Sequence, residues 1–173
     1  MNATQLSLRP YGPDDFALLQ ATLGVAEMTQ FLGGPENEEK LHSRHQRYVE
    51  LPSKGADRMF VILAGAAQEP AGTIGFWHHE REGESAWETG WAVLPAWQRH
   101  GLASRATLEI IARLRTEGSR RYLYAFPTIE NIASNAVCRK AGFELLGSEQ
   151  DEYPKGNLVT CNVWRYDLVR SPA

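Results

Sequence analysis

The residues best suited to chemistry lie around one short turn, Gln98–Ala103, with the sequence QRHGLA. An extended apolar segment, Trp91–Leu94, leads into the turn, and a helical pattern follows it directly. A turn that opens a helix presents unpaired backbone N–H groups at the positive end of the helix dipole, where phosphate or pyrophosphate binds. Gly101 lets a ligand approach the backbone closely, and Ser104 keeps the first helical turn small. The glycine patterns of P-loops and of dinucleotide-binding folds are absent, so the sequence predicts another kind of anion site.

Glu88 is the candidate for proton transfer. It stands shortly before Trp91, and strand alternation places it on one face with Gly90 and Ala92. A carboxylate there could accept a proton from an incoming ammonium group through a water molecule. The alternative is a structural carboxylate, or an anchor for a cation without proton transfer.

Four segments together resemble the GNAT superfamily of N-acetyltransferases. The turn Gln98–Ala103 fits the signature Q/R-x-x-G-x-G/A, and Asn131–Phe143 is similar to the second family motif, N-x-x-S followed by K-x-G-F. Phe31–Pro35 and Trp87–Trp91 resemble segments of the Rim-type branch, which contains ribosomal-protein N-terminal acetyltransferases. The resemblance covers nearly the whole chain. It implies an enzyme that uses acetyl-CoA as co-substrate.

The resemblance also implies how acetyl-CoA is held. The turn is expected to bind the pyrophosphate, and the preceding strand to pair with the pantetheine arm, because in the family this strand splays away from a parallel neighbour, here Arg121–Phe126. Arg99 and His100 either face phosphate or are solvated loop charges, and Asn131 contacts the cofactor, acts as a helix N-cap, or does both. The expected cofactor-binding residues are Trp91, Ala92, Val93, Gln98, Arg99, His100, Gly101, Leu102, Ala103, Ser104 and Asn131.

Ser134 is the second catalytic candidate, beside Glu88. It lies one helical turn after Asn131, and the resemblance implies a hydroxyl near the cofactor sulfur that could protonate the departing thiolate. Some relatives use a tyrosine where this chain has Cys138. The acid is therefore Ser134, water or no residue, since a thiolate leaves readily. Cys138 is expected to be a core residue rather than a nucleophile.

Composition narrows the class of protein. The chain has 173 residues, 43% apolar and 23% charged, with a net charge of −3, which predicts one globular domain over residues 1–173 and no nucleic-acid partner. No segment reads as a signal peptide or a membrane span, so a cytoplasmic protein that is a monomer or homodimer is expected. The two cysteines are expected to be free thiols. His42 and His45 lack a third ligand at metal spacing, so no metal is predicted, and the histidines outside the turn are expected to be solvated.

The hydrophobic pattern predicts an α/β fold with a mixed, mostly antiparallel sheet of about seven strands, flanking helices and, by resemblance, a splayed parallel pair. The expected strands are Leu6–Arg9, Met59–Ala64, Ala71–His79, Ser85–Leu94, Arg121–Phe126, Phe143–Gly147 and Leu158–Leu168. One helix is expected to begin at Pro13. Three others are expected at Glu36–Leu51, Leu102–Glu117 and Asn131–Ala141.

Specificity for the acceptor is expected from Phe31–Glu39 and from a polar loop, Glu149–Asn157, whose acidic residues either attract a cationic amine or are simply solvated. Three functions remain open at this point. The first is acetylation of a protein N-terminal α-amine. The second is acetylation of a small amine such as a polyamine, an antibiotic or an amino-acid derivative. The third is a CoA-binding sensor or interaction module without turnover.

Overall fold

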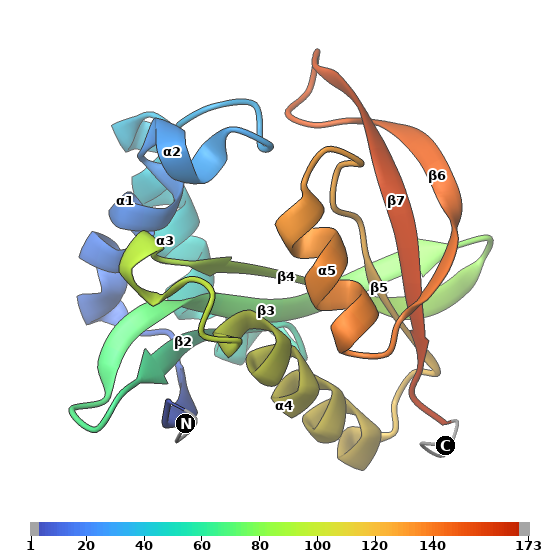
Figure 1. Cartoon of the computed structure of the whole chain (residues 1–173), viewed down its shortest axis with the longest axis horizontal. Coiled ribbons are helices and arrows are strands. Elements are labelled where there is room, and N and C mark those ends of the chain that lie inside the picture. The colour runs from blue at the N-terminus through green and yellow to red at the C-terminus, as the bar shows by residue number, and fades with distance from the viewer. Residues whose placement is uncertain (1–3, 170–173) are drawn as a thin grey trace.

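Seven strands form one sheet in the computed structural model of the protein, which describes residues 4–169 (Figure 1). Their order is β1-β2-β3-β4-β5-β7-β6, and every neighbouring pair is antiparallel except β4 and β5. This confirms the predicted mixed, mostly antiparallel sheet. The strands are β1 (Leu6–Pro10), β2 (Arg58–Ala64), β3 (Glu69–Arg81), β4 (Glu84–Val93), β5 (Tyr122–Ala125), β6 (Glu144–Glu152) and β7 (Leu158–Asp167).

Helices cover the sheet from both sides. Apolar residues of α4 and α5 pack with one set of strand residues, which includes Ile62, whereas α1 and α3 pack with the alternate set, which includes Val61. Both of these β2 residues are fully buried, as the continuous apolar run Met59–Ala64 predicts. The helices are α1 (Phe16–Leu23), α2 (Ala26–Thr29), α3 (Glu38–Lys54), α4 (Leu102–Glu117) and α5 (Ile132–Lys140), with short 3-10 turns at Pro13–Asp15 and Pro95–Trp97.

Helix α4 directly follows the turn that the sequence singles out. Its apolar stripe, Ala106, Ile110 and Leu114, is fully buried against the sheet. A glycine in the left-handed conformation stands at each end, Gly101 before the helix and Gly118 after it, and the Gly118 N–H donates to the Leu114 carbonyl. The predicted bounds of this helix are confirmed. No helix in residues 4–169 is long and apolar enough to cross a membrane.

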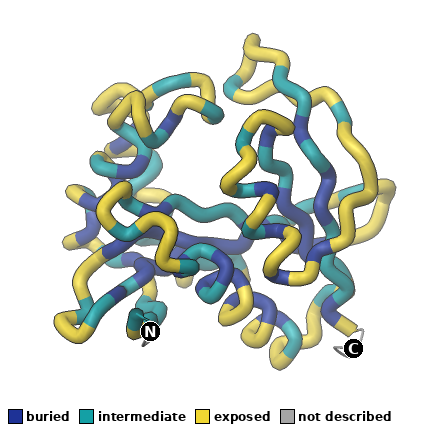
Figure 2. Tube along the Cα trace, viewed as in Figure 1, coloured by how far each residue is buried: buried dark blue, intermediate teal, exposed yellow. Residues whose placement is uncertain are grey.

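The predicted loop Glu149–Asn157 is wrong over its first half. Strand β6 continues to Glu152, which pairs with Leu158, and only Tyr153–Asn157 form the turn. Because β6 is an edge strand and is exposed along almost its whole length (Figure 2), acidic side chains there cost little and do not end the strand. Helix α3 also differs from its expected span, since Asn37 caps Lys40 and the helix begins at Glu38. The short helix α2 was not predicted.

Gly72 in β3 permits the close approach of β4. A Cβ atom added at Gly72 would lie 2.1 Å from the Ala92 carbonyl oxygen, which belongs to the backbone and cannot swing aside. We expect Gly72→Ala to lower the free energy of unfolding by about 2–3 kcal/mol, as overpacking of a buried site does. Urea denaturation would measure this loss. In the control Gly12→Ala the added atom lies 3.9 Å from its nearest neighbour, so a similar loss there would contradict the explanation.

Candidate active site

Strands β4 and β5 separate soon after they meet. Only two residue pairs join them, Trp87 with Leu123 and Glu88 with Tyr124, although β4 continues to Val93. Beyond Glu88, therefore, one edge of β4 has no partner strand among the described residues. This confirms the predicted splayed parallel pair, and it leaves a gap where an extended amide chain can pair with the backbone.

The hydrogen bonds at the end of β4 show which backbone groups face the gap. The Leu94 N–H donates to the Ala71 carbonyl of the β3 side, whereas the Val93 carbonyl accepts from the Gln98 side chain, with an N–O distance of 2.9 Å. Successive residues of a strand point their backbone groups in opposite directions. Trp91 and Val93 therefore face the gap, and Ala92 directs its backbone groups toward β3.

The turn after β4 has the shape of an anion cradle. Arg99 has a φ of 64° and Gly101 a φ of 73°, two left-handed residues that turn the chain into α4. Within the described part of the chain, the backbone N–H groups of Arg99–Ser104 donate no intramolecular hydrogen bond, and the first helical bond runs from Arg105 N–H to the Gly101 carbonyl. These N–H groups and the positive end of the α4 dipole fit a pyrophosphate.

The side chains of this turn divide into three kinds. Gln98 holds the turn to β4, and Arg99 and His100 are exposed. Leu102 and Ser104 are buried under the turn, while Ala103 is half-buried. The turn therefore acts mainly through its backbone shape.

Lys140 adds a positive charge to the cradle. Its Nζ lies 4.0 Å from the position that a Cβ atom on Gly101 would take. Sequence reasoning assigned Lys140 to the second motif but not to this turn, because only the packing of α5 against α4 brings the two together. A cation at this distance strengthens the attraction for phosphate.

Glu88 lies on the sheet face opposite α4, beside the start of the gap. Burial raises the pKa of its carboxyl group to about 7; a hydrogen bond from Trp77 opposes this rise, and the nearby charge of Asp151 reinforces it. Gly90 leaves room for the Trp77 ring, since an added Cβ would lie 3.0 Å from it. His79 is also close, with 3.3 Å between its Nδ1 and Glu88 Oε2. A carboxylate that is partly ionised at neutral pH can act as a general base.

Asn131 and Ser134 stand at the beginning of α5. The Asn131 Oδ1 accepts a hydrogen bond from the Ser134 N–H at 3.0 Å, so Asn131 is the N-cap of this helix. Its amide Nδ2 and the Ser134 hydroxyl make no hydrogen bond within residues 4–169, so both remain available to a ligand. The N-cap role and a cofactor contact are thus compatible.

Asn135, which the sequence did not single out, fixes the loop that leads into α5. Its buried amide donates to the carbonyls of Thr128 and Asn131, both at 2.9 Å. Its oxygen accepts from Asn162 and from the Trp164 indole, at 2.7 and 2.8 Å. All these bonds join β7, the loop and α5, so Asn135 positions Asn131 and Ser134. Its position in the second motif was the only available signal.

Both cysteines are buried free thiols, as predicted. Cys138 is fully buried in the main core, and burial raises its pKa to about 12. A thiol that stays protonated is a poor nucleophile. Cys138 is therefore a core residue and not a nucleophile.

A cavity of about 370 Å³ lies between the first half of the chain and the C-terminal hairpin. It brings together the two segments that the sequence predicted for acceptor specificity, and a Cβ atom added at Gly33 would lie against Pro154. Near the top of Figure 1, the segment after α2 faces the turn between β6 and β7. The lining also includes residues that sequence reasoning missed, in the loop before α5 and in β7. The lining residues are Gln30, Phe31, Gly33, Thr128, Glu130, Asn157 and Val159.

Carboxylates surround this side of the site. The charges of Asp151, Glu149, Glu130 and Glu88 all raise the pKa of Cys161, together with burial, which has the largest effect. Glu149 is paired with Arg81 at 2.9 Å. A cluster of carboxylates attracts cationic groups.

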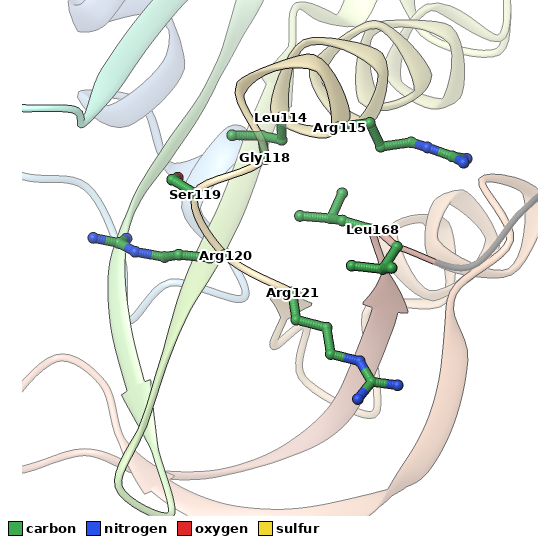
Figure 3. Close-up of a pocket in the computed structure, with 8 residues that line it drawn as sticks. Leu114, Arg115, Gly118, Ser119, Arg120, Arg121 and Leu168 are labelled. Atoms are coloured by element: carbon green, nitrogen blue, oxygen red, sulfur yellow. The ribbon is translucent and has the colours of Figure 1, made fainter.

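A second cavity, of about 510 Å³, lies at the opposite end of α4 (Figure 3). Two of its arginines are already engaged: Arg120 stacks on Trp87 at 3.6 Å, and Arg121 pairs with Asp167. It is therefore a structural hollow and not part of the site around Glu88.

The two histidines of α3 contact neighbouring aromatic side chains. His42 stacks on Phe16, and His45 shares a hydrogen bond of 2.7 Å with the Tyr11 hydroxyl. Within residues 4–169 no group of three or more His, Cys, Asp or Glu side chains could hold a metal ion. The expectation of solvated histidines is wrong for His45 and His79, which contact Tyr11 and Glu88.

Comparison with known proteins agrees with this geometry. A family model described as the acetyltransferase (GNAT) domain matches residues 5–144. No curated protein matches the chain.

Solved structures are similar over nearly the whole chain. An acetyltransferase from Salmonella typhimurium, which modifies the N-terminal serine of the 50S ribosomal subunit protein L7/L12, has 25% identity and a TM-score of 0.80, covering 96% of each chain. A coenzyme A complex of RimL, the ribosomal L7/L12 α-N-protein acetyltransferase, has 26% identity and a TM-score of 0.79, covering 96% of this chain and 95% of that one. Spermidine N-acetyltransferase from Vibrio cholerae shares the fold at 16% identity and a TM-score of 0.79, covering 95% of this chain and 96% of that chain.

Proposed function

Because the chain belongs to the GNAT acetyltransferase family, we propose that it transfers the acetyl group of acetyl-CoA directly to a protein N-terminal α-amine. The observation that carries this proposal is Glu88, whose pKa is raised to about 7 by burial and which forms the last residue pair of the β4–β5 ladder before the strand gap. Acetyl-CoA supplies an activated thioester. Residues of this chain bind acetyl-CoA, position the amine and move the protons.

Acetyl-CoA is held by the backbone more than by side chains. The N–H groups of Arg99–Ser104 and the Lys140 ammonium bind the pyrophosphate, and the gap-facing groups of Trp91 and Val93 pair with the pantetheine arm. An N–H of the same strand polarises the thioester carbonyl as negative charge develops on its oxygen. The Asn131 side-chain amide provides a further hydrogen-bond donor to acetyl-CoA.

The proton balance assigns a role to each catalytic candidate. Glu88 takes one proton from the acceptor ammonium through a water molecule, and the neutral nitrogen then attacks the carbonyl carbon. The carbon–sulfur bond breaks, and the thiolate takes a proton from the Ser134 hydroxyl or from water. The second proton, which the nitrogen loses on becoming an amide, replaces the one given to the thiolate. Positioning of the amine and thioester supplies much of the rate.

The pKa of Glu88 favours an α-amine over an alkyl amine. An α-ammonium group titrates near pH 8, about one unit above Glu88, whereas a lysine-type ammonium lies about three units above it. Each unit costs a factor of about ten in proton transfer. The two ribosomal L7/L12 acetyltransferases at 25% and 26% identity support the same acceptor class.

A small polyamine is the second candidate acceptor. The negative charges of Glu88, Glu130 and Asp151 all act on one thiol, Cys161, where each raises its pKa. Several carboxylates in one region of the molecule support a polycation as acceptor.

An acceptor panel separates the candidates. We would mix the protein and acetyl-CoA with N-terminal peptides, polyamines, aminoglycosides and amino acids, follow free thiol, and identify products by mass. Acetylated peptides are expected. Acetylated small amines alone would overturn the acceptor proposal, and binding of acetyl-CoA without thiol release would favour the module that lacks turnover.

A further inference from the structure

We propose that His79 is a positioning residue for Glu88, whose neutral imidazole donates its Nδ1–H to the carboxylate and holds it toward the acceptor. This inference rests on the proposed role of Glu88 as the base. It adds a residue on β3 that none of the sequence motifs contains.

The strand register places His79 in reach of Glu88. Trp77 is the direct partner of Glu88 across β3 and β4, and His79 is two residues farther along the same face. The His79 Nδ1 lies 3.3 Å from Glu88 Oε2, slightly longer than a typical hydrogen bond. With the Trp77 indole, Glu88 thus has two ring N–H groups beside it, both on β3.

Aromatic packing fixes the plane of the His79 ring. The ring centroids of Phe126 and Tyr124 lie 5.0 and 5.7 Å away. These neighbours come from β5 and from the loop that follows it. The imidazole therefore cannot rotate freely away from Glu88.

The surroundings select the neutral form with the proton on Nδ1. The His79 Nε2 is buried and has no hydrogen-bond partner within the described residues. The imidazolium ion and the other neutral tautomer both carry a proton on Nε2, where this buried donor would have no acceptor. A proton on Nδ1 instead has the Glu88 carboxylate within reach. Burial lowers the pKa of His79, and the charges of Arg81 and His78 on β3 act in the same direction, against Glu149 on β6. Tyr124 on β5, Asp151 on β6 and Cys161 on β7 are further titratable groups near this pair.

A hydrogen bond to the carboxylate stabilises its ionised form. His79 therefore opposes the effects of burial and Asp151, which keep Glu88 protonated. Loss of the Nδ1–H would raise the pKa of Glu88 further and leave less base at neutral pH.

The test compares His79→Phe with His79→Asn. Phenylalanine keeps the aromatic packing and removes the N–H, whereas asparagine places an N–H donor near the position of Nδ1. We expect the acid limb of kcat/KM for His79→Phe to move up by about one pH unit, a tenfold loss on the acid side that vanishes near pH 9. The limb of His79→Asn should stay close to that of the unaltered protein.

A second measurement does not depend on turnover. Carbon-13 labelling of glutamate side chains would follow the titration of Glu88 directly, assigned by its loss in Glu88→Gln, and His79→Phe should raise this pKa. An unmoved pKa, or an equal loss of activity at every pH, would overturn the proposal. If Glu88→Gln itself left the activity profile unchanged, the assigned base would be wrong, whatever the His79 variants show.

Discussion

Glu88→Gln is expected to lower kcat/KM at pH 7.5 by about 100-fold, the lower range for loss of a general base. Glutamine keeps the size and the polarity of the side chain but cannot take a proton. The acid limb near pH 7 should disappear, and the pH optimum should rise, because the variant relies on amine that is already neutral. Thiol release with the best peptide acceptor, followed from pH 5.5 to 9, measures both effects.

Thermal unfolding separates this effect from loss of the fold. The folded pKa of Glu88, about 7, lies above its ordinary value of 4.5, so the folded state binds more protons between these values. Glu88 therefore lowers stability as pH rises through that window. Glu88→Gln should be more stable than the unaltered protein at pH 8, with the difference shrinking toward pH 5. Full activity of Glu88→Gln at pH 7.5 would remove Glu88 as the base.

Gly101→Val is expected to weaken acetyl-CoA binding by about 30-fold or more, the loss of roughly one charge-assisted hydrogen bond. A β-branched residue resists the left-handed conformation, whose φ is 73°, and its side chain would extend toward Lys140 and the pyrophosphate. Isothermal titration calorimetry with acetyl-CoA would measure the change.

Gly118→Val is the matched control. Gly118 ends the same helix in nearly the same conformation, with a φ of 66° and open space around it. Both variants carry similar backbone strain, but only the first alters the cradle. Equal affinity of the two variants for acetyl-CoA would contradict the assignment of the pyrophosphate to this turn.

Local sequence was sufficient to predict the turn before α4 and the N-cap of α5. The turn around Gly101 and the cap at Asn131 each depend on a few consecutive residues, whose backbone preferences determine their shape. The splayed strand pair came from family resemblance rather than from the hydrophobic pattern. The structure shows it as a short parallel ladder beside the longer β4.

The surroundings of Glu88 depended on strand register instead. His79 and Trp77 reach Glu88 only because β3 pairs with β4 in one particular alignment, which no local pattern in the chain specifies. Asp151 reaches it because β6 continues into the residues expected to form a loop. Lys140 joins the cradle through the contact between two helices. Each missed residue is thus a long-range contact.

We propose that acetyl-CoA lies between β4 and β5 with its pyrophosphate on the Arg99–Ser104 turn. Residue-resolved amide hydrogen exchange, measured with and without acetyl-CoA, would locate the bound molecule. We expect slower exchange at Arg99–Ser104 and at the gap-facing amides of Trp91 and Val93. Unchanged exchange at all these amides at saturating acetyl-CoA, with protection elsewhere, such as around Gly118–Arg121, would contradict it.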